Sequence, residues 1–280
     1  YTEMVNAIRE HGSRIGKANF PIELHPYVVW KRVTEDSSKM LVNDINPIQN
    51  LKEGEAVTFG GTGGRNSRSL TRDTREHHPT DSGIISEATR DSSDAGISTF
   101  TSANPNLNSV RGTVTVKPIK DISPTSLLST SALLSPGSDK DDPKRVNFIN
   151  IQQSHGVACN GYTPAYIRTG YEQVLIHRVG EGYGNTAKQD GKVIAKSKDG
   201  MTVEYKDGTK EGFVIGRRFG KAPDFIVPHS MQSDLEEGSK FKAGDILTYN
   251  SGYFQKDTIN PSSVLWKAGV TTRVALLESR

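Results

Sequence analysis

The sequence predicts a mixed α+β protein whose C-terminal half is rich in β structure. Two Asp-Gly pairs, at 199–200 and 207–208, lie between alternating polar and apolar runs, which is the strongest short-range signal for a β-hairpin. Near the N-terminus the apolar residues have helical spacing instead. From Gly60 to about Asn108 the chain is dominated by Gly, Ser, Thr and Asp, which predicts a long loop of the kind that is usually functional or disordered.

The first predicted elements are helical. Met4, Val5 and Ile8 lie on one stripe of residues 2–12, and Gly12 ends that run, so we expect a short amphipathic helix. The next run, "SSKMLVNDINPIQN", begins with cap-type serines and then turns apolar. Pro47 is expected to end any helix in it at or before Asn46.

The later elements are predicted mainly as strands. The run "SVRGTVTVKPI" (109–119) alternates, whereas "SPTSLLSTSALLSP" (123–136) is an apolar segment that fits helix and strand equally. Beyond the hairpins, three further runs have strand character: "YEQVLIHRV" (171–179), "FKAGDILTY" (241–249) and "TTRVALLE" (271–278).

The composition limits the class of protein. A chain of 280 residues with a hydrophobic fraction of 34% and a mean hydropathy of −0.54 can bury a core but has much polar surface, so we expect a part of an assembly. The single cysteine, Cys159, excludes an internal disulfide and a cysteine-rich zinc site. No apolar run of membrane-spanning length and no signal-like start are visible, so the expected protein is soluble and intracellular, with no membrane partner.

The most unusual stretch is "GGTGGRNSRSLTRDTREHHPTDSG" (60–83). A glycine-hinged loop with Arg65, Arg68, Arg72 and Arg75 can follow a phosphate backbone and release counterions; a solvated charged loop is the alternative. The lysine of a Walker loop is absent. Adjacent histidines, His77 and His78, point apart in regular structure, which favours a rigid turn at Pro79 over a metal site.

Other local patterns are weaker. The run "DKDD", with Asp139, Asp141 and Asp142, could recruit a divalent cation, but a solvated acidic turn is the favoured interpretation. Neither a GxSxG nor an HExxH motif occurs, and Cys159 near His155 is a poor basis for a nucleophile pair. The residues therefore predict no stand-alone hydrolytic enzyme.

The order of these pieces resembles the β subunit of multisubunit DNA-directed RNA polymerases. "NPIQNLKEGEAVTFGGTGG", followed fourteen residues later by the second His of "RDTREHHPT", is similar to that family's Asn-Pro-Leu helix, Gly-Pro-Gly-Gly loop and Arg-Asp-Val-His-Pro-Thr motif. "GIISEATRDSSDAGI", the run 123–158, "FKAGDILTYNS" and "TTRVALLE" resemble later β-subunit segments in the same order. The resemblance runs from about Ser37 to Arg280. Its divergence and the shortened link between Arg111 and Asp121 resemble the polymerases of giant bacteriophages, in which the β subunit is split.

The resemblance implies a fold and a division of the chain. Residues 1–112 would form a region with short helices and long loops, like the fork loop and rifamycin pocket. Residues 113–280 would form a β-rich, hybrid-binding region that leads into a double-psi β-barrel. Within the first region, residues 60–75 with Arg65, Arg68 and Arg72 would be the fork loop that faces downstream DNA, where phosphate contacts position the nucleic acid without reading its sequence.

The resemblance also implies roles for single residues. Arg145 matches the arginine that reaches the phosphates of the incoming nucleotide, where a fixed positive charge stabilises the transferring phosphoryl group. Arg75 and Asp91 match residues near the active centre. Gln153 matches a glutamine that lines the RNA-DNA hybrid, and His155 replaces a second glutamine and could still donate to RNA phosphate. Asp142 is expected to be structural.

Several positions depart from the family. In the rifamycin pocket, Asn43 stands for an aspartate, Glu53 for a histidine, Ala56 for an arginine and Thr58 for a serine. A carboxylate thus replaces an imidazole and a methyl group replaces a guanidinium, which removes hydrogen-bond donors and reverses the charge of the pocket. These changes predict insensitivity to rifampicin. Asp94 in place of an asparagine, together with Glu53, puts negative charge where the family has RNA phosphate.

The expected partners follow from what the chain lacks. Two-metal phosphoryl transfer needs a fixed cluster of carboxylates. In the family this cluster comes from an Asp-rich motif of the β′ subunit, Asn-Ala-Asp-Phe-Asp-Gly-Asp, and that motif does not occur in this sequence. Mg²⁺ is therefore expected to be held by a partner subunit. The other expected partners are the remaining β fragment, template DNA, nascent RNA and nucleoside triphosphates, in the cytoplasm of an infected bacterium or in a virion. The alternatives are a β-rich structural or virion protein and a nucleic-acid-binding module without catalysis.

Overall fold

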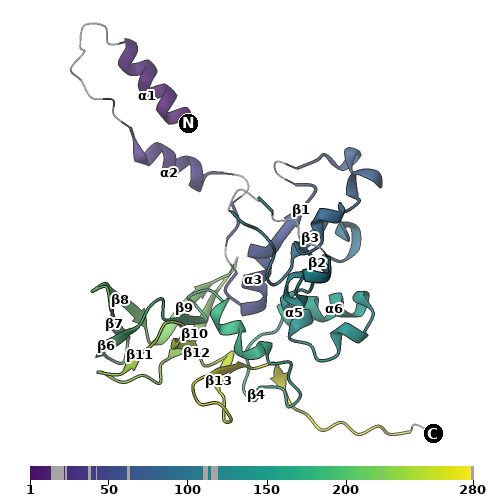
Figure 1. The fold of residues 1–280 in the computed structure, drawn as a ribbon, viewed down its shortest axis with the longest axis vertical. Helices are drawn as coiled ribbons and strands as arrows, with labels where there is room; N and C mark the ends of the chain where they lie inside the picture. The colour runs from purple at the N-terminus through teal and green to yellow at the C-terminus, as the bar shows by residue number, and fades with distance from the viewer. Residues whose placement is uncertain are drawn as a thin grey trace. The chain divides into compact units, whose positions relative to one another are not determined.

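The computed structural model describes residues 1–13, 22, 24–36, 39–41, 43–61, 64–109, 113–114, 119–222 and 224–278. The chain separates into two compact units, residues 1–41 and 42–280 (Figure 1). The predicted boundary after residue 112 adjoins residues 110–112, which lie outside the described ranges, and it stays a prediction.

The described residues of the first unit form two helices, α1 (Thr2–Ser13) and α2 (Pro26–Thr34). The predicted N-terminal helix is therefore confirmed. Helix α2 starts with proline at its first position, where the missing N–H has no intrahelical partner to lose. Its Trp30 is exposed. Across the described helices, none combines the length and apolar character that a membrane crossing requires.

The second unit begins with helix α3 (Pro47–Glu55), and here the prediction for Pro47 is wrong. Proline begins this helix rather than ending an earlier one, because the Asn46 side chain caps it by accepting from the Ile48 and Gln49 amides. Residues 39–41 and 43–46 are not helical, and Ser37, Ser38 and Val42 lie outside the described ranges.

The described residues of the segment 60–108 are mostly loop and turn, as the composition predicts. The prediction missed strands β2 (Ile85–Thr89) and β3 (Ser98–Thr101), which form an antiparallel sheet with β1 (Ala56–Thr58) in the order β1-β3-β2. Short strands such as these show no clear alternation, since their stability comes from pairing and from burial of Ala88 and Phe100. Short 3₁₀ turns occupy parts of the remaining segment.

Three helices follow the sheet. The ambiguous run 123–136 forms α4 (Pro124–Leu127) and α5 (Thr130–Leu133), which are capped by the hydroxyls of Ser123 and Ser129. Helix α6 (Pro143–Ser154) is capped by Asp142. The strand predicted over 109–119 lies mostly outside the described residues; Val114 forms an isolated bridge with Leu107.

The C-terminal half is β-rich, as predicted, and its sheets are antiparallel (Figure 1). The Asp-Gly hairpins are confirmed as the connections of β6, β7 and β8, with Gly208 at a φ of +83°. The sheet orders are β5-β12-β10-β9, β11-β6-β7-β8, β13-β14 and β15-β4. The strand bounds are β4 Tyr162–Thr163, β5 Gly184–Thr186, β6 Gly191–Lys196, β7 Gly200–Tyr205, β8 Lys210–Val214, β9 Gly216–Lys221, β10 Ile226–Gln232, β11 Lys240–Phe241, β12 Ile246–Asn250, β13 Phe254–Lys256, β14 Val264–Trp266 and β15 Gly269–Val270.

Two strand predictions are wrong. Residues 171–179 form two 3₁₀ turns, in which the consecutive Leu175 and Ile176 are both buried, so their side chains do not alternate between faces. Residues 271–278 have no strand assignment, and Leu276 and Leu277 are 96% and 90% exposed. Because no described strand pairs with this segment, its β propensity alone does not make it part of a sheet. In contrast, 241–249 does contribute β12.

Two apolar clusters hold the unit together. The larger one joins α3 to the later strands and contains Ile48, Leu134, Leu175, Ile176, Tyr183, Tyr249, Tyr253, Phe254, Val264 and Trp266. The smaller one lies in the hairpin sheet and contains Ala187, Val193, Met201, Val203, Tyr205, Phe241 and Leu247. A closed barrel is not formed by the described strands, so the double-psi barrel stays a prediction.

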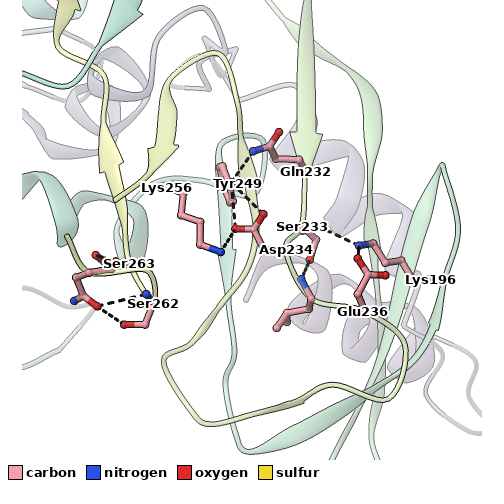
Figure 2. Close-up of polar contacts among 11 residues, drawn as sticks. Lys196, Gln232, Ser233, Asp234, Glu236, Tyr249, Lys256, Ser262 and Ser263 are labelled. Carbon is pink, nitrogen blue, oxygen red and sulfur yellow. Dashed lines mark hydrogen bonds and ion pairs between the residues drawn. The ribbon is translucent and has the colours of Figure 1, made fainter. Parts of the chain in front are cut away.

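Polar contacts link the two four-stranded sheets (Figure 2). The Tyr249 hydroxyl on β12 accepts from Gln232 Nε2 at 2.6 Å and lies 3.3 Å from Asp234 Oδ2. The Lys196 Nζ of β6 donates to the Ser233 carbonyl at 3.2 Å and pairs with Glu236. The segment that follows β10 is therefore attached to both sheets.

Candidate nucleic-acid and nucleotide interface

Arg145 lies in the first turn of helix α6. The helix is anchored by Val146, Asn150 and Ser154, which repeat every four residues and are buried. The Asp142 carboxylate accepts from the Lys144 amide at 2.9 Å, which confirms its structural role as a helix cap. Arg145 is exposed and has no carboxylate partner within the described part of the chain. Its guanidinium is thus available to an external anion.

Gln153 and His155 lie at the other end of α6, about 12 Å or more from Arg145 given the helical rise per residue. The Asn46 side chain donates to the Gln153 and Gly156 carbonyls and so attaches α3 to the end of α6. Gln153 also lines a cavity of about 230 Å³ with Trp266, and its Oε1 is buried without a hydrogen-bond partner. His155 is exposed as the residue that follows the helix.

The turn that carries Asp91 lies beside α6. The Thr89 amide, at the end of β2, donates to Asn147 Oδ1 at 2.9 Å. Asp91 is two residues beyond Thr89, and Arg145 is two residues before Asn147, so one hydrogen bond holds the two predicted positions in the same region. The Asp91 carboxylate accepts from the Ser92 amide and begins a short 3₁₀ turn.

The four predicted arginines follow β1 in a chain of tight turns. The Arg65 amide donates to the Phe59 carbonyl at 2.8 Å, and 3₁₀ turns cover Ser67–Ser69 and Asp73–Arg75. None of these arginines has an ion-pair partner among the described residues, and all but Arg75 are exposed. Thr62 and Gly63 lie outside the described ranges, so the expected mobility of the glycine loop is untested.

The neighbouring His-Pro segment forms the predicted turn. His78 and Asp81 form a capping box at the N-terminal end of the 3₁₀ turn Pro79–Asp81. The His78 ring accepts from the Thr80 amide, and the Asp81 carboxylate accepts from the His78 amide at 2.9 Å. Within the described ranges, no three His, Cys, Asp or Glu side chains form a group that could hold a metal ion.

Two cations outside the predicted set, Lys52 of α3 and Arg90 after β2, lie beside strand β3, where the Arg90 amide donates to the Ser98 carbonyl at 3.0 Å. The Lys52 ammonium is 4.8 Å from the centroid of the Phe100 ring on β3. Burial, with a smaller contribution from the Arg90 charge, lowers the pKa of Lys52 to about 8. Lys52 follows the buried Ile48 by one helical turn, which was the available signal that it points inward.

The positions expected in the rifamycin pocket carry an internal contact. Glu53 accepts from the Asn43 amide at 3.0 Å and from Gln49 Nε2 at 3.1 Å. Ala56 and Thr58 lie on β1. The carboxylate of Glu53 is therefore engaged in holding the segment before α3.

The comparisons with known proteins agree with part of this picture. Residues 1–68 match the bacteriophage RNA polymerase family. The match covers the first unit and continues through α3 and β1 to Arg65 and Arg68, but it stops before Arg145. No curated protein matches the chain. The family match supports a polymerase-related function in a bacteriophage.

Proposed function

We propose that this chain is a β-subunit segment of a split, multisubunit DNA-directed RNA polymerase. It shapes one wall of the active-site cleft and is inactive alone. Arg145 contacts the phosphates of the incoming nucleotide, and Gln153 and His155 face the RNA-DNA hybrid. Arg75 and Asp91 lie near the reacting centre, while Arg65, Arg68 and Arg72 contact the phosphates of downstream DNA.

The observation that carries the proposal is the family match over residues 1–68 together with the ordered motifs that continue it. Helix α6 supports the proposal because it positions residues from two of these motifs. Its capped first turn presents Arg145 to solvent, and its last turn is attached to α3. Unpaired guanidinium groups suit phosphate, since they form bidentate, charge-assisted hydrogen bonds.

The metal chemistry belongs to a partner in this proposal. The described residues provide no cluster of carboxylates, so the chain's own part is to bind and orient phosphate. Mg²⁺ would be held by a β′-like subunit. The remaining β fragment would complete the double-psi barrel. The complex would act in the cytoplasm of an infected bacterium or be carried in the virion.

The test is nucleotide addition by the complex purified with its native partners. Arg145→Ala should leave subunit assembly intact, raise the KM for nucleoside triphosphates and lower kcat/KM by about a hundredfold, which corresponds to roughly 3 kcal/mol of phosphate stabilisation. Lys144→Ala, one residue earlier and also exposed, is the matched control and should have little effect. An assembly defect with unchanged kinetics would favour a structural protein instead.

A further inference from the structure

Two cavities lie where the loop after α6 meets the end of β12 and the turn that follows it. The larger one has a volume of about 490 Å³ and the smaller one, which Gln153 lines, about 230 Å³. Three residues, Tyr162, Tyr253 and Lys267, line both cavities. Together the cavities have the size of a small-molecule site.

Lys267 is the dominant charge in these cavities. No Asp or Glu and no second Lys or Arg lines either of them within the described part of the chain. His229 lines the larger cavity, but it is buried, and burial lowers its pKa, so the ring is neutral at pH 7. The cavities therefore favour an anion.

The chain supplies no counter-charge to Lys267. Within the described ranges, no carboxylate lies at ion-pair distance from its ammonium. The carboxylate of Asp44, a residue beside His229, is already engaged. It accepts from the Lys221 amide at 2.9 Å and from Asn50 Nδ2 at 3.3 Å.

The Lys267 side chain is fixed but keeps free donors. Its backbone amide donates to the Tyr253 carbonyl at 2.8 Å, and its Nζ donates to the Ser251 carbonyl at 2.6 Å. An ammonium has three N–H donors, so two remain for a ligand. Burial lowers the pKa of this half-buried group from its ordinary value, because the charge is poorly solvated there. A bound anion would compensate for that lost solvation.

Neutral polar groups in the cavities complement this charge. Gln153 Oε1 is buried and accepts no hydrogen bond from a described residue. The Tyr162 hydroxyl likewise has no hydrogen bond to the described part of the chain. The Tyr253 hydroxyl is occupied, since it accepts from the Ala158 amide at 3.2 Å and donates to the Ile45 carbonyl. The site thus offers a cation, a hydroxyl donor and an amide acceptor.

We infer that the two cavities form a binding site for a free nucleotide, with Lys267 as the contact to its phosphate group. Phosphate has several acceptor oxygens, which suit the ammonium and the Tyr162 hydroxyl. A nucleotide also carries sugar hydroxyls and base amino groups, which are the donors that Gln153 Oε1 lacks. The inference shares only Gln153 with the proposed function and involves no partner subunit.

The experiment titrates the full chain by calorimetry with each of the common ribonucleoside 5′-monophosphates. The comparison ligands are the matching nucleosides, inorganic phosphate, succinate and a single-stranded RNA that has only internal phosphates. The site variants are Lys267→Met, which removes the charge but keeps an apolar stem, and Tyr162→Phe, which removes only the hydroxyl. Lys198→Met removes the same charge from an exposed position between β6 and β7 and is the control. Thermal unfolding confirms that each variant is folded.

We expect the native chain to bind at least one of the nucleotides. Lys267→Met should weaken that binding by about tenfold or more and Tyr162→Phe by about threefold, while Lys198→Met changes nothing. The nucleosides and inorganic phosphate should bind more weakly, because each lacks part of the contacts. Bound nucleotide should also slow the alkylation of Cys159, the single cysteine, which is exposed and lines the larger cavity. That protection should be lost in Lys267→Met.

Equal affinities for the native chain and Lys267→Met would overturn the inference, as would a lack of binding of every nucleotide. Inorganic phosphate or succinate that binds as tightly as the nucleotides would contradict the nucleotide assignment. Tighter binding of the RNA that depends on Lys267 would assign the contact to a polynucleotide and contradict it too. None of these measurements requires nucleotide addition, so their failure is distinguishable from a failure of the Arg145 test.

Discussion

Ser92 has a left-handed backbone with a φ of +64°, in the turn that carries Asp91. A side chain in this conformation is strained by about 1 kcal/mol, whereas glycine is not. Ser92→Gly should therefore stabilise the fold by about 0.5–1 kcal/mol, less than the full strain because glycine also gains freedom in the unfolded chain. The shift in the urea midpoint measures this gain.

The matched control is Ser93→Gly, the next exposed residue of the same turn. It lacks the positive φ, so glycine should lower stability there by a few tenths of a kcal/mol or more. If both substitutions shift the midpoint in the same direction, the account of backbone strain is wrong.

Glu55 gives a dependence of stability on pH. Burial raises its pKa to about 7, against the opposing effects of Arg178 and the Thr130 hydroxyl. Since the folded state holds the proton more tightly than the unfolded state, Glu55 stabilises the fold below its ordinary pKa. This contribution is lost as pH rises from about 4.5 to 7.

The comparison of the native chain with Glu55→Gln isolates this effect. As pH rises over that range, the free energy of unfolding of the native chain should fall relative to that of Glu55→Gln. Above pH 7 the difference between the two should become constant. Glu236→Gln is the control, because its surface ion pair with Lys196 contributes little. A difference that is independent of pH for Glu55→Gln would show that the carboxyl titrates normally.

At the scale of elements, Asn46 joins two helices. Its side-chain oxygen caps α3, and its amide nitrogen donates to two carbonyls at the end of α6. Asn46→Ala should lower the free energy of unfolding by about 2–4 kcal/mol, from loss of the cap and of buried hydrogen bonds. Denaturant unfolding is the measurement.

Asn46→Ser separates the two contributions. Serine restores the cap but not the donor to α6, so it should recover about 1 kcal/mol. Full recovery by serine would show that the link to α6 adds nothing to stability.

Local chemistry decided which elements could be predicted. The hairpins β6-β7-β8 were predictable because Asp-Gly turns and alternation are encoded in neighbouring residues. The role of Pro47 was not predictable from its neighbours. A proline can end one helix or begin the next, and here it begins α3 because Asn46 caps that helix. The strand expected over 171–179 failed because Leu175 and Ile176 are both buried by distant strands, which the local pattern does not contain.

At the scale of the whole molecule, the candidate site was predictable in part. The order of motifs indicates Arg145, Gln153 and Asp91, whose roles stay predictions. The packing of Lys52 on the Phe100 ring was not visible in the sequence, because it depends on how β3 and α3 pack. Contacts between residues this far apart in the sequence require the fold.

Rifampicin tests the cleft of the assembled enzyme. We expect transcription to continue at drug concentrations that stop a bacterial polymerase. Glu53 is engaged with Asn43 and Gln49, and Ala56 offers no donor to the drug. Inhibition at bacterial concentrations in a transcription assay would contradict the predicted pocket.

The central claim is that Arg145 contacts the phosphates of the incoming nucleotide. The most direct measurement is a structure of the purified complex stalled with a non-hydrolysable nucleoside triphosphate. The account predicts the Arg145 guanidinium within about 3 Å of a phosphate oxygen, beside metal ions held by carboxylates of another subunit. A guanidinium that points into solvent, far from nucleic acid and from any carboxylate-bearing partner, would contradict it.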